Sequence, residues 1–562
     1  MPPGLAKQIP AGRKEDSDMG RKTIAAALVL ALMPLGARAQ FSTSGDDPAS
    51  TRWMQKDDGH FRIVYPQGLD SLADVYQSLL ETWRTAVTRS TGMEMRQGRS
   101  LPVVLHAHSG ISNGLVTWAP KRMELYTRPT PYDPEALSWE RNLTVHESRH
   151  VSQMMLGYKP LFLPLRLLMG DLLPGALSAI YPGPALLEGD AVVTETALTD
   201  MGRGRDGDFL NYYMSAFDSG DLRNWYSWRY GSWRHYAPNW YALGYMTIAG
   251  TRVFYDDPLF MDNYFSRIGR NPIRFGTMRK EMRRAAGGIR FADAWDGIVQ
   301  GFRDNWEARA QASVPFTAAA PVTEAPSWYE AYEGGVWAGD RFFAVRSGLL
   351  RSAELVEVSP DGEVSSLRPF SSSTSRLAYD PMRGRLYWSE TLTDARWSLS
   401  ADSDIRYIQV DGGAGGAASG SGVVSDSDAV SGNGHAAADG FNSVPGSGRT
   451  AADTRIRTLT HGRRLFNPSP SPDGSLVAAV EYPVEGGTGL VIIDAANGKT
   501  VSSFRAPDGV QLTEPAWAGD RIYVSAVTDR GMGIYVHDGA AFHVALESIP
   551  AKISGLREHD GA

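Results

Sequence analysis

The chain has 562 residues, with 59 glycines, 33 prolines, 15 tryptophans, 23 tyrosines and no cysteine. Its net charge of -7 gives no electrostatic reason to expect nucleic acid or an anionic membrane as a partner. The lack of cysteine excludes disulfides, thiolate metal ligands, a cysteine nucleophile and lipid attachment through cysteine. Any metal must therefore be bound by nitrogen and oxygen atoms.

The N-terminal residues have the pattern of an export signal. Two basic residues precede an apolar run over 24–35, and Ala37-Arg38-Ala39 fits the small-x-small pattern of a cleavage site. The run is too short to span a membrane comfortably. We predict a signal peptide over 1–39, with Met19 as an alternative start, and a flexible segment over 40–57. The protein is then exported to the periplasm, the cell surface or the medium, and is not a lipoprotein.

Three regions with different sequence texture follow. Residues 58–314 are rich in aromatic residues and helical periodicity, 315–326 have the Pro/Ala composition of a linker, and 327–562 contain short β-type runs. We therefore expect an α+β domain followed by an all-β domain. A Gly/Ser-rich stretch over 411–453 cannot bury a core and is predicted to be a disordered insertion.

In the first region, the apolar patterns predict strands and helices in alternation at the start and helices afterwards. Apolar residues at helical spacing predict a helix over 70–91 with a stripe that includes Leu72, Val75, Leu79, Leu80, Trp83 and Val87. Strand-like runs occupy 61–65, 101–105 and 122–126, a turn is expected over 109–114, and residues 134–310 are mainly helical. The most apolar stretch, Leu161–Tyr181, is interrupted by Arg166, Asp171 and two prolines. It is expected to form core or a hydrophobic cleft wall, with docking at a membrane surface as the alternative.

The last region repeats a theme without a strict period. WAGDR precedes a strand-like run at 337–341 and again at 517–521, and the turn SPDG occurs at 359–362 and 471–474. These turns and strands resemble TolB-like and WD-type β-propeller repeats. The resemblance implies about four blades, over 330–362, 366–410, 454–500 and 505–545.

The motif H-E-x-x-H marks the candidate reaction centre. His146, Glu147 and His150 lie in a stretch where Trp139, Leu143, His146, His150 and Met154 recur at three- and four-residue spacing. Both histidines therefore lie on one face of a predicted helix, one turn apart, where two imidazoles can bind one Zn²⁺. Glu147 can reach the attacking water as a general base.

A second helical stretch supplies a third candidate ligand. Glu188 and Glu195 lie seven residues apart in LLEGDAVVTE, hence on one helix face. The H-E-x-x-H helix followed by an E-G-x-A-x-x-x-E helix resembles the gluzincin zinc peptidases. The resemblance implies a zincin-like fold, Glu188 as third ligand of a single Zn²⁺ and Glu195 as a support for a ligand histidine.

A further sequence match indicates candidates for the group that donates a hydrogen bond to the oxyanion. Tyr241-Ala242-Leu243-Gly244 resembles the Y-x-x-G segment of gluzincin aminopeptidases, in which the tyrosine hydroxyl stabilises the tetrahedral oxyanion. Tyr241 is the first candidate, Tyr245 the alternative one turn later, and Tyr236 a weaker one.

Two upstream features bear on substrate binding. The aminopeptidase motif G-x-M-E-N is replaced by Arg122-Met123-Glu124-Leu125, so Glu124 could grip a free N-terminus but is more simply a solvated strand residue. The departure favours cleavage within peptides over removal of N-terminal residues. His106 and His108 lie on one side of a predicted strand and form a possible second metal pair, although ordinary strand polarity is the simpler explanation.

These patterns together predict an exported zinc metallopeptidase acting on peptides or proteins, with a propeller whose partner is unknown. Nucleic acid is not expected as a partner, and peripheral membrane contact is not favoured. The alternative is a non-catalytic protein in which the propeller binds a partner and the zincin domain is a scaffold.

Overall fold

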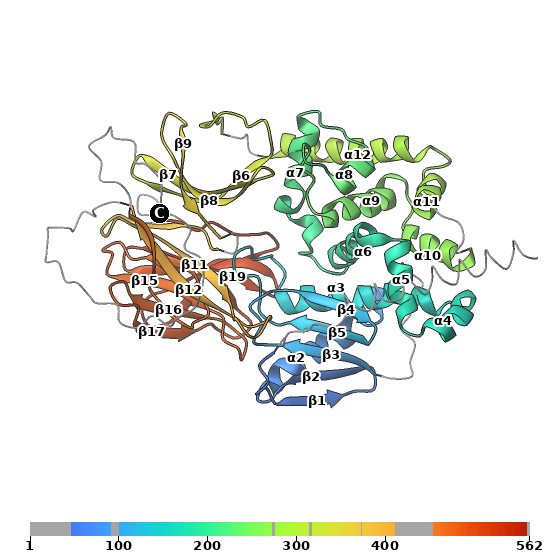
Figure 1. Cartoon of the computed structure of the whole chain (residues 1–562), viewed down its shortest axis with the longest axis horizontal. Coiled ribbons are helices and arrows are strands. Elements are labelled where there is room, and N and C mark those ends of the chain that lie inside the picture. The colour runs from blue at the N-terminus through green and yellow to red at the C-terminus, as the bar shows by residue number, and fades with distance from the viewer. Residues whose placement is uncertain are drawn as a thin grey trace, which may run out of the picture.

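The computed structural model describes residues 47–90, 100–271, 276–313, 317–371, 374–410 and 453–558. The predicted signal peptide and all but the last residue of the predicted insertion lie outside these residues. A mixed sheet with helices forms one part of the molecule, and a set of β-sheets packs beside it (Figure 1). This agrees with the expected α+β region followed by a β region.

The first part contains a sheet that, in the described residues, has five strands in the order β1-β2-β3-β5-β4. The inner strands β2, β3 and β5 are parallel, while β1 and β4 pair antiparallel at the two edges. Three strands fall where the sequence predicts them, whereas the edge strand β4 lies in a stretch for which no strand is predicted. The strands are β1 Trp53–Asp57, β2 Phe61–Pro66, β3 Leu101–His106, β4 Gly114–Trp118 and β5 Lys121–Tyr126.

Two expectations for the N-terminal part are wrong in detail. The segment 40–57 is not flexible to its end, because β1 occupies its last five residues and pairs with β2. Helix α2 (Asp70–Trp83) is shorter than predicted, and it buries Ala73, Tyr76 and Leu80 while Val75 is 47% exposed. Packing against the sheet decides which face of α2 is buried. The sequence of α2 has two overlapping apolar stripes, so the sequence alone does not indicate which stripe is buried.

Helices follow the sheet, and three of them surround the candidate site. These are α3 (Trp139–Met154), α6 (Gly183–Leu198) and α9 (Trp240–Phe254), of which α6 packs against both of the others. The remaining helices are α4 Leu163–Met169, α5 Leu172–Ile180, α7 Gly207–Asp218, α8 Trp225–Tyr230, α10 Phe260–Arg270, α11 Thr277–Ala285 and α12 Phe291–Ala312. Short 3₁₀ turns are η2 Ala86–Thr88, η3 Met155–Tyr158, η4 Pro160–Phe162 and η5 Arg203–Arg205.

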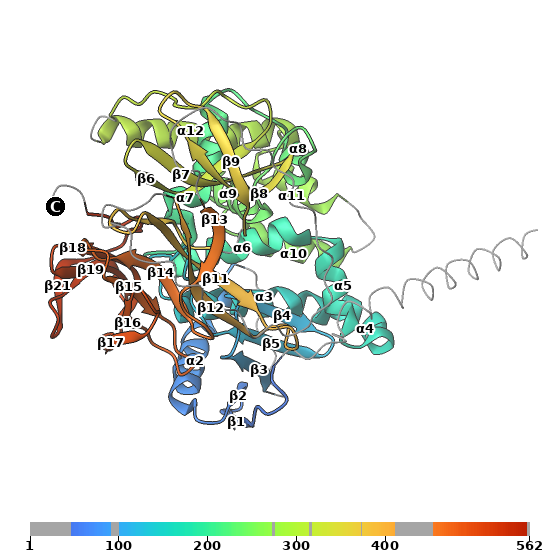
Figure 2. The ribbon, with the colours of Figure 1, turned by 60° about the vertical axis from the view of Figure 1, so that its left-hand side comes forward.

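The stretch Leu161–Tyr181 is mostly not core, contrary to the first expectation. It forms α4 and α5, which project from one end of the molecule (Figures 1 and 2). Helix α4 has no buried residue, whereas Leu173 and Leu177 of α5 are buried in the main core of the α+β part.

The β part contains four antiparallel sheets of four strands each in the described residues, a four-bladed β-propeller-like arrangement. The first blade contains β6 Glu330–Ala338, β7 Arg341–Gly348, β8 Arg351–Val358 and β9 Val364–Pro369, and the second contains β10 Ala378–Asp380, β11 Arg385–Thr393, β12 Ala401–Gln409 and β13 Asp453–Thr458. The third blade contains β14 Leu465–Pro470, β15 Leu476–Glu481, β16 Gly489–Asp494 and β17 Thr500–Arg505. The fourth blade contains β18 Gln511–Ala518, β19 Arg521–Thr528, β20 Gly531–His537 and β21 Phe542–Ile549.

The number of blades matches the prediction, but the blade limits differ. Strand β13 begins at Asp453, the last residue of the Gly/Ser-rich stretch, and pairs with β12, as in the register Arg406↔Thr458. The stretch therefore separates the last two strands of the second blade. The predicted limits of the third blade, 454–500, include most of β13. That prediction is wrong because it pairs β13 with the strands that follow it closely in the chain.

The segment between β5 and α3 joins the two parts of the molecule. The Pro131 carbonyl accepts a hydrogen bond from Asn467 Nδ2 at 2.7 Å, and Tyr132 packs edge-on against Phe466. Near the chain end, Lys552 Nζ contacts Asp133 and lies 2.9 Å from Asp208 Oδ2. The β part therefore supports the same loop that borders the candidate site.

Candidate functional site

Helices α3 and α6 bring three of the predicted ligand residues together. The Nε2 atoms of His146 and His150 lie 3.2 Å apart, and Glu188 Oε2 lies 3.1 Å from the first and 3.2 Å from the second. In a tetrahedral site with bonds near 2.0 Å, ligand atoms lie about 3.3 Å apart. The donor set of two imidazoles and one carboxylate, at this spacing, therefore fits a single Zn²⁺.

A buried ion pair fixes α3 relative to α6. The Arg149 guanidinium makes two hydrogen bonds of 2.8 Å to the two oxygens of Asp190, and it also donates to the carbonyls of Val87 and Arg89. Arg149 lies between the two histidines in sequence and Asp190 lies two residues after Glu188. The pair therefore sets the distance between the ligands on the two helices.

The second nitrogen of each histidine also has a partner. Gln153 Nε2 donates to Asp190 and to the Leu187 carbonyl, so its Oε1 faces His150 Nδ1 at 2.8 Å. This oxygen accepts the Nδ1 proton and leaves Nε2 of His150 available for a cation. Nothing in the sequence patterns singles out Gln153 except its position one turn after His150.

Two side chains lie at Nδ1 of His146: the predicted Glu195, which can accept its proton, and Arg203, which can only donate and which the sequence does not identify. The Nδ1 atom lies 3.3 Å from Glu195 Oε2 and 2.9 Å from Arg203 Nη2. Arg203 Nε in turn donates to Glu195 Oε1 at 2.7 Å. When Glu195 accepts the Nδ1 proton, the Nε2 lone pair of His146 is free to bind a cation. Arg203 balances the charge of the fully buried Glu195.

Helix α9 approaches α6 closely enough to bring Tyr241 into the site. A β carbon at Gly189 would lie 2.1 Å from the carbonyl carbon of Gly244, and one at Gly244 would lie 1.7 Å from the Ala185 carbonyl oxygen. Only glycine fits either position. The Tyr241 ring, one turn before Gly244, stacks on His146 with ring centroids 6.1 Å apart.

The other two tyrosines face elsewhere. The Tyr245 hydroxyl donates to the Gly204 carbonyl at 3.3 Å, and the ring packs against Phe209. Tyr236 stacks on Tyr329 with ring centroids 3.7 Å apart. Of the three candidates, Tyr241 is the one that lines the cleft with the histidines.

Glu147 faces the cleft across from the edge strand β4. The cleft has a volume of about 230 Å³ and includes Asn113, Gly114, Leu115 and Val116 on the β4 side. A β carbon at Gly114 would lie 2.6 Å from Glu147 Oε1, so glycine makes room for the carboxylate. Glu147 Oε2 is buried and has no hydrogen-bond partner among the described residues.

The carboxylates of the site differ in their pKa values because their neighbours differ. Burial raises the pKa of Glu147. Burial acts in the same direction on Glu188, but the neighbouring His150 and His146 outweigh it and hold the Glu188 pKa well below its usual range. Burial also raises the pKa of Glu135, at the cleft rim, to about 7, although Arg203 opposes the shift. The site therefore holds a carboxylate that stays ionised, Glu188, beside a more basic one, Glu147.

Two other candidates lie outside the cleft. Glu124 is on an inner strand of the sheet, contacts Arg122 and is not among the cleft-lining residues. The His106/His108 pair does not form, because β3 ends at His106 and its Nδ1 contacts Asp47 Oδ2 at 2.7 Å. The strand periodicity on which that pair depends stops before His108.

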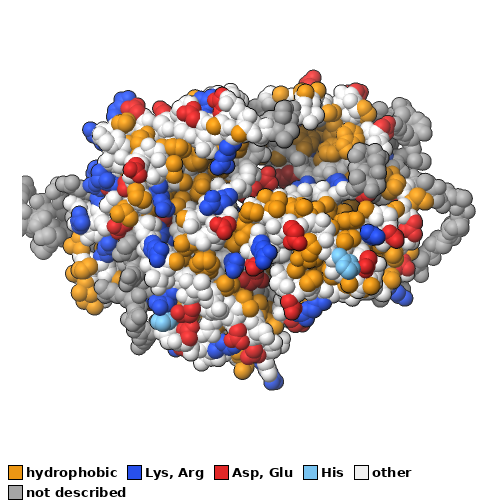
Figure 3. Space-filling view, turned by 180° about the vertical axis from the view of Figure 1, so that it is seen from behind, with side chains coloured by type: hydrophobic (Ala, Val, Ile, Leu, Met, Phe, Trp, Pro, Cys, Tyr) orange, Lys and Arg blue, Asp and Glu red, His pale blue; other side chains and the backbone are white. Residues whose placement is uncertain are grey.

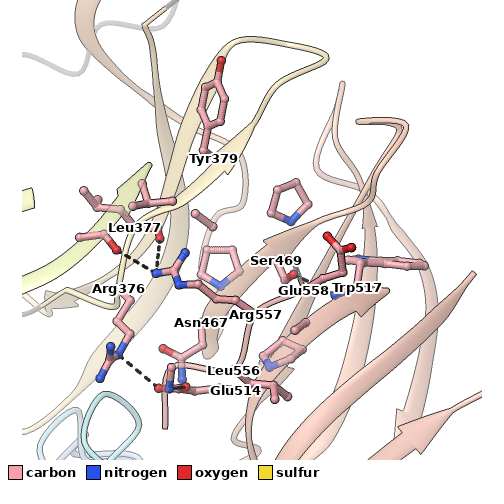
Figure 4. Close-up of a pocket in the computed structure, with 18 of the residues that line it drawn as sticks. Arg376, Leu377, Tyr379, Asn467, Ser469, Glu514, Trp517, Leu556, Arg557 and Glu558 are labelled. Carbon is pink, nitrogen blue, oxygen red and sulfur yellow. Dashed lines mark hydrogen bonds and ion pairs between the residues drawn. The ribbon is translucent and has the colours of Figure 1, made fainter. Parts of the chain in front are cut away.

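A second cavity of about 470 Å³ lies among the first strands of the four blades (Figure 4). The chain's last described residues enter it, with the Gly555 amide donating to Glu514 Oε2 at 2.6 Å and Arg557 donating to the Gly335 carbonyl at 3.0 Å. Arg376 faces Glu514 at 3.7 Å. Arg557 also donates to the Leu377 carbonyl at 3.4 Å, so the C-terminal segment connects the first, second and fourth blades.

No family model and no curated protein sequence matches the chain. Among solved structures, it is similar to the β-propeller domain of the Trilobed protease from Pyrococcus furiosus, with 8% identity over 39% of this chain and 58% of that chain and a TM-score of 0.25. It is also similar to an acylaminoacyl peptidase from Pyrococcus horikoshii, with 10% identity over 40% of this chain and 33% of that chain and a TM-score of 0.24. TolB from Acinetobacter baumannii has 13% identity over 36% of this chain and 39% of that chain, with a TM-score of 0.23.

The chain thus spans about a third to three fifths of the length of these structures. Among the described residues, no helix has both the length and the apolar character needed to cross a membrane.

Proposed function

We propose that the protein is a zinc-dependent endopeptidase of gluzincin type. The observation that carries the proposal is the triangle of His146 Nε2, His150 Nε2 and Glu188 Oε2, with edges of 3.1–3.2 Å, beside the buried and unpartnered Glu147 Oε2. Zn²⁺ bound by these three residues would polarise the scissile carbonyl and acidify the attacking water.

The protein's own groups divide the remaining work. Glu147 accepts the proton of the attacking water and returns it to the leaving nitrogen, for which its raised pKa suits it. The Tyr241 hydroxyl donates to the carbonyl oxygen as that oxygen gains charge. Among the described strands, β4 pairs with β5 on one side only, so an extended peptide can bind to its other side, beside Glu147, by strand addition.

Cleavage within the peptide is favoured over removal of N-terminal residues. The carboxylate that would bind a free N-terminus by analogy, Glu124, is engaged with Arg122 away from the cleft. Peptide segments on both sides of the scissile bond can then extend along β4.

Hydrolysis of internally quenched peptides with blocked termini tests the proposal, together with zinc content by elemental analysis. The wild-type chain should bind one zinc and cleave, and Glu147→Gln should retain the zinc and lose about 10²–10⁴-fold of the activity. The exposed Glu307→Gln, far from the cleft, is the matched control. Undiminished cleavage by Glu147→Gln, or a wild-type chain that is zinc-loaded but inert on a broad peptide library, would refute the proposal.

A further inference from the structure

The end of the molecule that carries α4 combines exposed leucines with basic residues. Large apolar side chains that are 40–80% exposed gather there on η4, α4 and α5, namely Leu161, Leu163, Leu165, Leu167, Leu168, Leu172 and Ile180. Soluble surfaces rarely expose so many large apolar side chains together, and such patches mark interaction sites.

Buried neighbours hold the exposed helix α4 in place. Leu173 and Leu177 of α5 are buried in the main core, and Pro174 contacts Gly157, where a β carbon would lie 2.8 Å from its ring. The Arg166 guanidinium lies 4.5 Å above the Tyr158 ring. The leucines of α4 are therefore held outward by packed neighbours.

Basic residues lie on the helices next to this apolar tip, the exposed part of η4, α4 and α5. Lys159 lies against α10, where a β carbon at Gly269 would meet its Cδ at 2.6 Å, and α10 packs on both η4 and α11. Residues 257–293 contain eight Arg or Lys and four acidic residues, an excess of four positive charges in a chain of net charge -7. Some of these cations are paired, as Arg284 is with Glu281 and Asp257, while Arg270, Arg279 and Arg283 are exposed.

The same combination is visible on the surface. Figure 3 has hydrophobic side chains gathered low on its left-hand end, where α4 lies, and Lys and Arg side chains above them. Figure 1 places α4, α10 and α11 toward this end of the molecule, and in Figure 2 α4 projects beyond the other two.

We propose that this end docks on an anionic lipid bilayer, with the α4 leucines in the acyl boundary and the α10–α11 cations at the headgroups. An amphipathic element enters the interface by about 5–10 Å, and one weak apolar anchor becomes stable when a polybasic patch assists it.

A bilayer fits the shape of the tip better than a second copy of the chain. Helix α4 is seven residues long and convex, so two such tips cannot bury the ~800 Å² per partner that a stable interface needs. A deformable acyl layer has no such requirement. The docking does not depend on the proposed peptidase activity, and it revises the expectation from net charge, because the basic residues are concentrated at one end.

Flotation of the full chain with unilamellar vesicles tests the proposal. Vesicles of phosphatidylcholine alone are compared with vesicles that contain roughly a third phosphatidylglycerol, at low and at physiological ionic strength. We expect flotation with the anionic vesicles, weakened by salt. Leu167→Asn/Leu168→Asn, at positions 80% and 74% exposed, should lower the vesicle affinity by about tenfold or more.

Two further variants complete the test. Arg270→Gln/Arg279→Gln should lower the affinity for anionic vesicles by about tenfold at low salt. Leu350→Asn, at a 62% exposed leucine of the β part, is the matched control and should bind as the wild type does.

Three results would overturn the proposal. The wild type could fail to float. The Leu167→Asn/Leu168→Asn chain could float unchanged, which would assign the contact to another segment, such as the apolar run 24–35. The wild type could be a dimer by light scattering that this double variant converts to a monomer without any vesicle binding, which would assign the tip to a second copy.

Discussion

Replacing Gly244 with alanine tests the close approach of α6 and α9 on which the candidate site depends. The new β carbon would lie 1.7 Å from the Ala185 carbonyl oxygen and 2.9 Å from the Gly189 α carbon. Both atoms belong to the backbone, so no side-chain rotation can relieve the overlap. Helix α9 must therefore move away from α6. Overpacking usually costs about 1–3 kcal/mol, and the two backbone contacts favour a loss near 3 kcal/mol in the free energy of unfolding.

The same displacement moves Tyr241, one turn earlier on α9, away from His146. Peptide hydrolysis should therefore fall, while zinc content should persist because the three ligands lie on α3 and α6. Urea denaturation measures the stability, with Gly175→Ala as the matched control. Gly175 is a helical glycine of α5 with open space around its α carbon, so alanine there should be neutral or stabilise by up to about 1 kcal/mol. Equal urea midpoints for the two variants would refute the reasoning.

Two further predictions concern the supports of the site. Arg149→Met leaves the buried Asp190 carboxylate with Gln153 but without its cationic partner, and we expect a loss of about 3–5 kcal/mol in the free energy of unfolding, measured by urea denaturation, whereas a loss below about 1 kcal/mol would contradict the buried pair. The Glu135 pKa is about 7 in the folded chain and 4.5 for the ordinary side chain, so the stability that this group contributes is fully present below pH 4.5 and is lost as the pH rises through 7. Glu135→Gln removes that dependence, and its melting temperature relative to the wild type should rise between about pH 5 and pH 8. A difference that is the same at both pH values would contradict the shift.

The candidate site was predictable wherever its residues follow each other on one helix. The spacing of His146 and His150 places both imidazoles on one face of any helix that forms there, and Glu188 and Glu195 share a face for the same reason. Assigning Glu188 to the same centre required a resemblance, because no local rule links residues 38 positions apart. The structure brings its Oε2 within 3.2 Å of both histidines.

The residues that hold the candidate ligands and Tyr241 in position were not predictable. Arg203 comes from a 3₁₀ turn and Arg149 is one of many arginines, so neither has a sequence signal of its own. Gly189 and Gly244 are two of 59 glycines, and their role follows only from the meeting of two helices. The strand β13 likewise pairs across a long insertion, a partner that chain proximity cannot indicate.

The sequence by itself determined the local periodicities: the helix with its two histidines, the inner strands of the first sheet and the number of blades. Local hydrophobic spacing and turn residues are short-range properties, so a single segment contains all the information they need. The tertiary structure alone decided which face of α2 is buried, that the Leu161–Tyr181 segment carries an exposed tip, and which tyrosine faces His146. Each of these outcomes depends on what packs against a segment, and burial is a property of the neighbours as much as of the residues themselves.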